Sequence, residues 1–221
     1  MANLILKPTS GGSLILQDEG GTAAHTIDAS GNHTLSGNIT SPTLVTPTIA
    51  SMANCTFPSG HTLQVVQSVK QDGFSHAGTA ETLITGYNCS ITPVAAGSKI
   101  LVYYSFDSST NTSITARAYM ERKIGSAAWA KLTAAMGTET GSGMNTASIS
   151  HAGGENNWEM QKRAGMFLDT PTYTLTNAVQ YRIGIQNESS SNTIYIGKTG
   201  RNNTAYHPVT ASILILTEVA G

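Results

Sequence analysis

Residues with catalytic potential are few in this 221-residue chain, and their spacing does not fit an enzyme. A glycosidase needs two carboxyl groups a few ångströms apart. The candidate acidic residues are Asp107, Glu121, Asp169 and Glu188. We expect Asp107 and Glu188 in loops and Glu121 on a solvated strand face. No Gly-x-Ser-x-Gly turn or phosphate-binding glycine loop occurs, so the sequence predicts no catalytic residue.

The histidines do not form a recognisable metal site. They are His25, His33, His61, His76, His151 and His207. No two of them have HxH or HxxxH spacing, which places metal ligands together on a strand or a helix. The nearest cluster combines His151 with Glu155 and Glu159, in a glycine-rich stretch that we interpret as a flexible loop. The sequence therefore predicts neither a metal site nor a cofactor.

Aromatic residues within polar loops are the best candidates for binding. Trp158 follows the sequence Glu-Asn-Asn, and Arg201 and Asn202 precede Tyr206. Aromatic faces stack on sugar rings, and neighbouring amide and guanidinium groups bind hydroxyls. Two interpretations are open: these four residues bind a glycan, or they fill the end of a domain or a subunit interface.

The N-terminal segment, residues 1–60, has too little apolar surface to fold alone. Its candidate anchoring residues come in two groups, which are Leu4, Ile5 and Leu6 and then Leu14, Ile15 and Leu16. Two Ser-Gly-Asn sequences, one Ser-Pro step and one Thr-Pro step follow them. We expect an extended, stalk-like segment that becomes ordered when several chains associate and that attaches to a partner. A disordered tether is the alternative.

Residues 61–221 show the two-residue periodicity of half-buried strands. The predicted strands are residues 63–71, 83–92, 100–104, 113–121, 159–168, 179–186, 193–197 and 212–219. The run at 100–104 is apolar throughout, which predicts a strand buried on both faces. Many short strands separated by Gly, Asp and Ser turns predict an all-β fold: an antiparallel β-sandwich of jelly-roll type.

Helical signals are almost absent. The best helical candidate is residues 127–135, a short alanine-rich stretch between Gly125 and Gly137. Its length is below that of a stable helix. We favour a strand at residues 129–132 instead.

The composition excludes several classes of protein. Charged residues make up 11% of the chain, against roughly 25% in typical domains. The net charge is -1 and no basic block occurs, so nucleic acid is not an expected partner. No apolar run reaches the roughly 18 residues of a membrane helix, and the N-terminus lacks the features of a signal peptide. We therefore expect assembly in a cytoplasm without membrane insertion.

The two cysteines, Cys55 and Cys89, have no local metal-binding or redox motif. Neither belongs to a CxxC sequence, and no histidine lies at ligand spacing. We interpret them as free, small and mostly buried residues. A disulfide between them is the alternative.

Several segments resemble a family of tailed-bacteriophage virion proteins, usually described as tail fibre or structural proteins. The resembling segments are residues 63–74, Thr92-Pro93 before residues 98–102, residues 167–171, 181–183 and 213–221. The resemblance implies a homotrimer whose N-terminal part attaches to other virion proteins and whose sandwich faces outward. The family has no catalytic residues to transfer to this chain.

The sequence thus predicts a non-enzymatic virion protein, assembled in the host cytoplasm. The leading hypothesis is a trimeric tail fibre or receptor-binding protein that adheres to host surface glycans. One alternative is a capsid decoration protein that stabilises the head. Another is a tail-associated polysaccharide-degrading enzyme, which would need a carboxylate pair in a subunit groove.

Overall fold

The computed structural model describes residues 12–17, 20, 23–30, 33–35, 57–112, 115–137, 149–152, 158–201 and 208–221. The chain divides into two compact units, Met1–Ser51 and Met52–Gly221. Every strand pairing among the described residues is antiparallel, and their helical structure is limited to the 3-10 turn η1 (Thr133–Ala135). No described helix is long and apolar enough to cross a membrane. The predicted all-β class is confirmed.

The N-terminal unit contains a small antiparallel sheet with strand order β1-β2-β3. Its strands are β1 (Leu14–Gln17), β2 (Ala23–Ile27) and β3 (His33–Leu35). Ile15 and Leu16 of this unit are 47% and 50% exposed. An isolated sheet of this size is marginally stable in water. The candidate anchoring residues Leu4, Ile5 and Leu6 lie outside the described residues.

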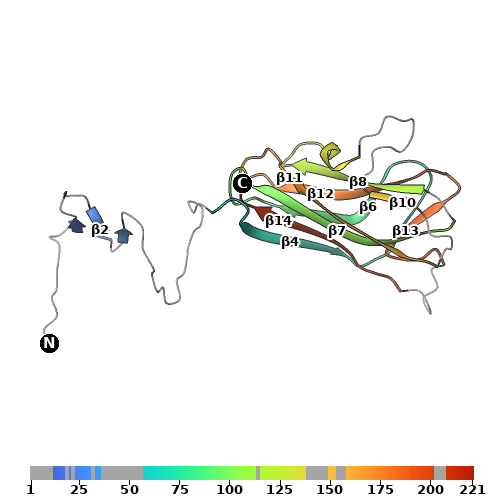
Figure 1. The fold of residues 1–221 in the computed structure, drawn as a ribbon, viewed down its shortest axis with the longest axis horizontal. Coiled ribbons are helices and arrows are strands. Elements are labelled where there is room, and N and C mark those ends of the chain that lie inside the picture. Colours follow the sequence, from blue (N-terminus) through green and yellow to red (C-terminus); the bar gives the residue numbers. More distant parts are fainter. Residues whose placement is uncertain are drawn as a thin grey trace. The chain divides into compact units, whose positions relative to one another are not determined.

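The second unit, which we call the head, is a sandwich of two antiparallel sheets (Figure 1). Its strands are β4 (Thr62–Lys70), β5 (Phe74–Ala77), β6 (Thr82–Ile91), β7 (Lys99–Thr110), β8 (Thr115–Ile124), β9 (Ala130–Lys131), β10 (Ile149–Ala152), β11 (Gln161–Asp169), β12 (Val179–Asn187), β13 (Thr193–Ile196) and β14 (Ser212–Val219). One sheet has the order β4-β14-β7-β13-β5, and β11 also pairs with β7. The other has the order β10-β8-β12-β6, and β9 pairs with β8.

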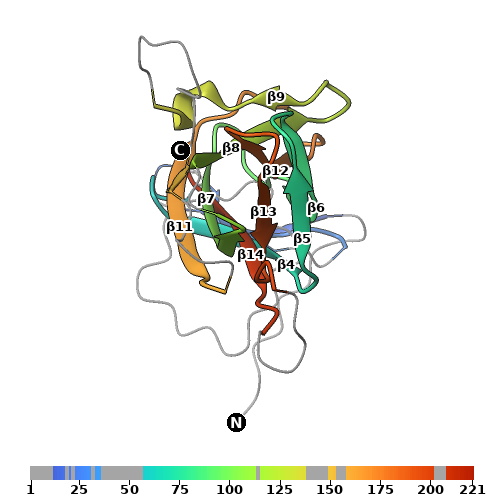
Figure 2. The same ribbon diagram turned by 90° about the vertical axis from the view of Figure 1, so that its right-hand side faces the viewer.

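Two of the strands in the first sheet are interrupted. Lys70 at the end of β4 pairs with Ser212, and Phe74 at the start of β5 pairs with Ile196, so β4 and β5 follow one line. β13 and β14 likewise lie in succession along β7. Figure 2 shows the sandwich from the end where β5 and β13 lie, with β11 and β5 at opposite sides.

The order of the strands is that of a jelly roll. We count β4 with β5 as one strand and β13 with β14 as another, leave out the short β9, and number the resulting eight strands in chain order. In this numbering the first sheet has the order 1-8-3-6 and the second has the order 2-7-4-5. This is the arrangement of eight strands in two sheets that defines the jelly roll. Most connections between successive strands cross from one sheet to the other, whereas β8, β9 and β10 stay in the second sheet.

The core fills the space between the two sheets. The first sheet contributes Ile100, Val102, Phe106, Leu214 and Leu216, and the second contributes Tyr87, Ile91, Met120, Val179, Tyr181, Ile183 and Ile185. All of these side chains are at most 2% exposed. They alternate along each strand with outward-facing residues, as the two-residue periodicity predicts.

Most predicted strands agree with the structure to within a few residues. The run at 100–104 is an exception, since Leu101 and Tyr103 are only half-buried on the outer side of β7. Residues 129–132 contain the predicted strand as β9, which η1 follows. Cys89 is free and buried, as we predicted, whereas Cys55 lies outside the described residues.

Two loop predictions were wrong. Asp107 lies within β7 and is 8% exposed, because Lys162 and Gly197 contact this part of the strand. His151 lies in β10, where it pairs with Ala116 of β8. In both cases pairing with a distant strand orders a stretch whose local sequence is typical of a loop.

Candidate aromatic and arginine binding sites

Trp158 and Arg201 form a stacked pair on the head. Trp158 lies shortly before β11 and is 46% exposed. The Arg201 Cζ atom lies 4.3 Å from the centre of its ring, which is the geometry of a cation–π interaction. The structure thus brings two of the four predicted binding residues together. The other two, Asn202 and Tyr206, lie outside the described residues.

Arg201 is carried by residues 197–211, which connect β13 to β14. The connection starts at Gly197, whose backbone N–H donates to the Asp107 carbonyl oxygen of β7 at 2.8 Å. The Thr210 N–H donates to the Gly197 carbonyl oxygen, also at 2.8 Å, and so closes the connection. Both ends of this connection are therefore fixed at Gly197 beside β7. Arg201 lies four residues after Gly197 and contacts Trp158.

Replacing Gly197 by alanine is expected to lower the free energy of unfolding by about 2 kcal/mol. Gly197 has φ +68, which favours glycine, and an added Cβ would lie 2.8 Å from the Thr210 carbonyl oxygen. Urea unfolding measures the change. Gly78→Ala is the matched control, because Gly78 also has a positive φ but no atom within 4 Å of an added Cβ. Equal losses in the two variants would show that the Thr210 contact has no effect.

A second stacked pair, Trp129 with Arg182, was not predicted from the sequence. The Arg182 Cζ atom lies 4.0 Å from the centre of the Trp129 ring. The same guanidinium forms an ion pair with Glu121 across β12 and β8, with Nη2 2.6 Å from Oε2. Glu121, which we expected on a solvated strand face, lies on the outer side of β8, where its side chain is only 15% exposed.

A bulge in β6 opens a shallow groove beside Trp129. Arg182 of β12 pairs with Asn88, but Gly184 pairs with Leu83, so residues 84–87 stand opposite Ile183 alone. Bulges of this kind are frequent next to binding sites. The groove has a volume of about 340 Å³ and is lined by Leu83, Ile84, Thr85, Gly86, Asn88, Trp129 and Arg182. Its lining combines an aromatic ring, aliphatic groups, an amide and a guanidinium.

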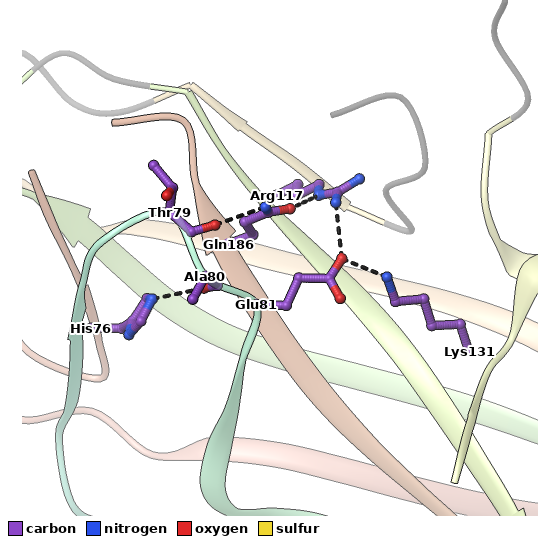
Figure 3. A network of polar contacts seen from close by, with 7 residues as sticks. All are labelled: His76, Thr79, Ala80, Glu81, Arg117, Lys131 and Gln186. Atoms are coloured by element: carbon purple, nitrogen blue, oxygen red, sulfur yellow. Dashed lines mark hydrogen bonds and ion pairs between the residues drawn. The ribbon is translucent and has the colours of Figure 1, made fainter. Parts of the chain in front are cut away.

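A polar network holds β9, and with it the segment that contains Trp129, against the second sheet (Figure 3). Glu81 accepts hydrogen bonds from Lys131 of β9 and Arg117 of β8. Arg117 also donates to the Gln186 Oε1 atom at 2.6 Å, and Gln186 donates to the Thr79 carbonyl oxygen at 2.8 Å. The network thus ties the turn before β6 to the outer side of β8 and β12.

The remaining candidate carboxylates have structural partners. Asp169 is 4% exposed and contacts Arg122 and the Tyr181 hydroxyl. Asp107 lies 3.6 Å from the Lys162 ammonium group, while Glu188 is exposed just beyond β12. Within the described part of the chain, no three His, Cys, Asp or Glu residues are placed to share a metal ion.

Comparisons with known proteins give no family. No protein-family model and no curated protein matches the chain. One similar solved structure is that of infectious bursal disease virus Gx strain, at 12% sequence identity and TM-score 0.34, covering 74% of this chain and 37% of that one. Another is that of the Gt strain, at 13% identity and TM-score 0.33, covering 86% and 45%. The chain spans less than half of either, and neither similarity supports a conclusion about fold or function.

Proposed function

We propose that this protein is a non-enzymatic structural component of a tailed-bacteriophage virion. Its particular role is that of a trimeric tail fibre or receptor-binding protein, with the head presented to the host and the N-terminal segment attached to other virion proteins. The exposed Trp158–Arg201 pair on a jelly-roll head is the observation that carries the proposal. Jelly rolls occur in viral capsid and lectin domains, which is support by analogy of fold.

The proposed mechanism is weak adhesion to host surface glycans. The exposed ring of Trp158 offers a surface for a sugar ring, and Arg201 offers donors for hydroxyl groups. The groove beside Trp129 has the same combination of groups. Single contacts of this kind are weak, but several heads acting together multiply the affinity. The exposed Ile15 and Leu16 of the N-terminal unit are the described candidates for attachment.

Replacing Trp158 by alanine is expected to weaken binding to host lipopolysaccharide or capsule about twofold to tenfold, because stacking on an aromatic ring contributes roughly 0.5–1.5 kcal/mol. A glycan array and surface plasmon resonance with purified full-length protein measure the effect. Leu175→Ala is the matched control, since Leu175 is 47% exposed and Trp158 is 46% exposed. We expect the control variant to bind as the wild type does.

The location of the protein on intact particles separates the leading role from capsid decoration. Electron microscopy with a labelled antibody is expected to place it at the tail. Labelling over the head, together with no binding on the glycan array, would contradict the adhesion role and favour a decoration protein.

A further inference from the structure

The outer side of the first sheet is uncharged and mostly apolar over part of β4, β14, β7 and β11. Cross-strand pairing aligns its residues in three rows over β4, β14, β7 and β11. The rows are Val65, Thr217, Leu101 and Leu168, then Gln67, Ile215, Tyr103 and Met166, and finally Val69, Ile213, Ser105 and Ala164. We call these residues the apolar face. None of them is charged.

The side chains at the two edges of the apolar face are the most exposed. Met166 and Leu168 of β11 are 70% and 47% exposed, and Val65 and Val69 of β4 are 60% and 45% exposed. The central strands β7 and β14 contribute half-buried residues between them. Scattered apolar residues on a surface are ordinary, but a continuous apolar patch marks an interaction site.

The outer side of the second sheet has the opposite character. Its cross-strand pairs join Glu121 to Arg182 and Arg117 to Gln186, and Lys123 lies opposite Gln180. The contrast shows that the apolar composition is specific to one side of the sandwich. On the outer side of the first sheet, the charged Lys162 and Asp107 lie just beyond the last of the three rows.

The size of the apolar face suits the centre of a specific interface. Four strands about 4.8 Å apart make the apolar face about 19 Å wide, and its three rows cover about 17 Å along the strands. Its area is therefore about 320 Å². A specific interface buries at least about 500 Å² on each partner, and its apolar centre has a polar rim. Lys162 of β11 and Lys99 of β7 lie on the same side, two residues beyond the outermost rows, and would belong to that rim.

The absence of charge from these rows makes the apolar face compatible with itself. Copies of one chain around a threefold axis bring identical groups close together near that axis, so a charged centre would place like charges near each other. Here the groups that meet are all uncharged, and apart from the Gln67 amide they are aliphatic, aromatic or small.

We propose that the apolar face is buried against neighbouring copies of this chain around a threefold axis. The inference rests on the homotrimer in the proposed function and names the surface through which its heads associate. It assigns different tasks to the two sides of the sandwich. The apolar face joins neighbouring heads, and the side with Trp129 and Arg182 remains open to ligands.

Light scattering after size-exclusion chromatography of the full-length protein tests this proposal. The wild type is expected to have about three times the mass of one 23.1 kDa chain. Met166→Glu and Val65→Lys place charges at opposite edges of the apolar face, where the single chain exposes these side chains, so both are expected to remain folded. Each substitution is expected to reduce the measured mass to that of one chain, or to weaken the association of the chains at least a hundredfold.

Ser90→Glu is the matched control, because it places the same charge at an exposed position of β6 on the second sheet. Its mass is expected to equal that of the wild type. A wild-type mass of one chain would overturn both the homotrimer and the apolar-face inference. A wild-type trimer that persists in both charged variants would overturn the inference alone. Loss of incorporation into virions without any change in mass would also overturn it, because another virion protein would then cover the apolar face.

Discussion

Replacing Asp169 by alanine is expected to lower the free energy of unfolding by about 3 kcal/mol, because the change leaves two polar partners without their shared acceptor. Asp169 is 4% exposed at the end of β11. Its carboxylate accepts a hydrogen bond from the Tyr181 hydroxyl at 2.6 Å and two from the Arg122 Nη1 atom at 2.7 Å. Arg122 and Tyr181 belong to the second sheet, so this carboxylate links the two sheets.

Most of the loss is expected to come from Tyr181, whose side chain is fully buried. The Arg122 side chain is 28% exposed and can regain hydration in the variant. Asp169→Asn keeps an acceptor for the tyrosine and is expected to cost less than Asp169→Ala. Urea unfolding monitored by tryptophan fluorescence measures both changes.

Glu81→Ala provides the comparison for a surface network. Glu81 also contacts two cations, Arg117 and Lys131, but its side chain is 32% exposed (Figure 3). Ion pairs in contact with water contribute about 0–1 kcal/mol. A loss in Glu81→Ala as large as that in Asp169→Ala would contradict the role assigned to burial.

The fold was predictable because strands that bury one face carry a local signal. Alternation at Val179, Tyr181, Ile183 and Ile185 identified β12 together with its inward side, since side chains in a strand point to opposite faces in turn. The same signal located most other strands of the head. The sheet order was not predictable in detail, because it depends on pairings between residues far apart in the sequence.

The polar end of β7 shows where this local signal fails. Asp107, Ser108, Ser109 and Thr110 resemble a loop by composition, yet they continue the strand and are buried. β13 pairs with Ser108, Ser109 and Thr110 on one side. Hydrogen bonds to a distant strand therefore outweigh the low strand propensity of these residues.

The candidate binding residues were predictable only as single residues. Trp158 and Arg201 lie in polar stretches, which marked both, but nothing in the sequence indicated that they stack. The pair of Trp129 and Arg182 escaped prediction because Trp129 was assigned to a strand and Arg182 to a solvated strand face. The bulge in β6 was not predicted, because its residues fit the pattern of a continuous strand. The glycine at position 86 is a local sign of the bulge, and in the structure Gly86 has φ +77.

The head is expected to lose stability steeply above about pH 10, where tyrosines in an unfolded chain ionise. Tyr87 and Tyr181 are both fully buried. Burial raises the pKa of each hydroxyl far above its usual value of 10.0, and the negative charge of Asp169 raises the pKa of Tyr181 further. Both side chains therefore stay protonated in the folded head at a pH where the unfolded chain releases their protons.

The sign of the effect follows from the number of bound protons. Above the pKa of unfolded tyrosine, the unfolded chain binds fewer protons than the folded head, so the free energy of unfolding decreases as the pH rises. Each buried tyrosine contributes about 1.4 kcal/mol per pH unit, and the two together contribute about 3 kcal/mol per pH unit. This stabilisation is fully present below about pH 10. Urea unfolding between about pH 9 and about pH 11 measures the slope.

Tyr87→Phe separates the contribution of one tyrosine from every other group that titrates in this range. The Tyr87 hydroxyl donates to the Ser105 and Ile213 carbonyl oxygens, at 3.1 and 2.9 Å, so the variant is less stable at neutral pH as well. That loss is the same at every pH, whereas the slope above about pH 10 is expected to fall by about 1.4 kcal/mol per pH unit. An unchanged slope would mean that Tyr87 ionises equally readily in the folded head, and a hydroxyl sealed between the two sheets cannot do so without opening the core.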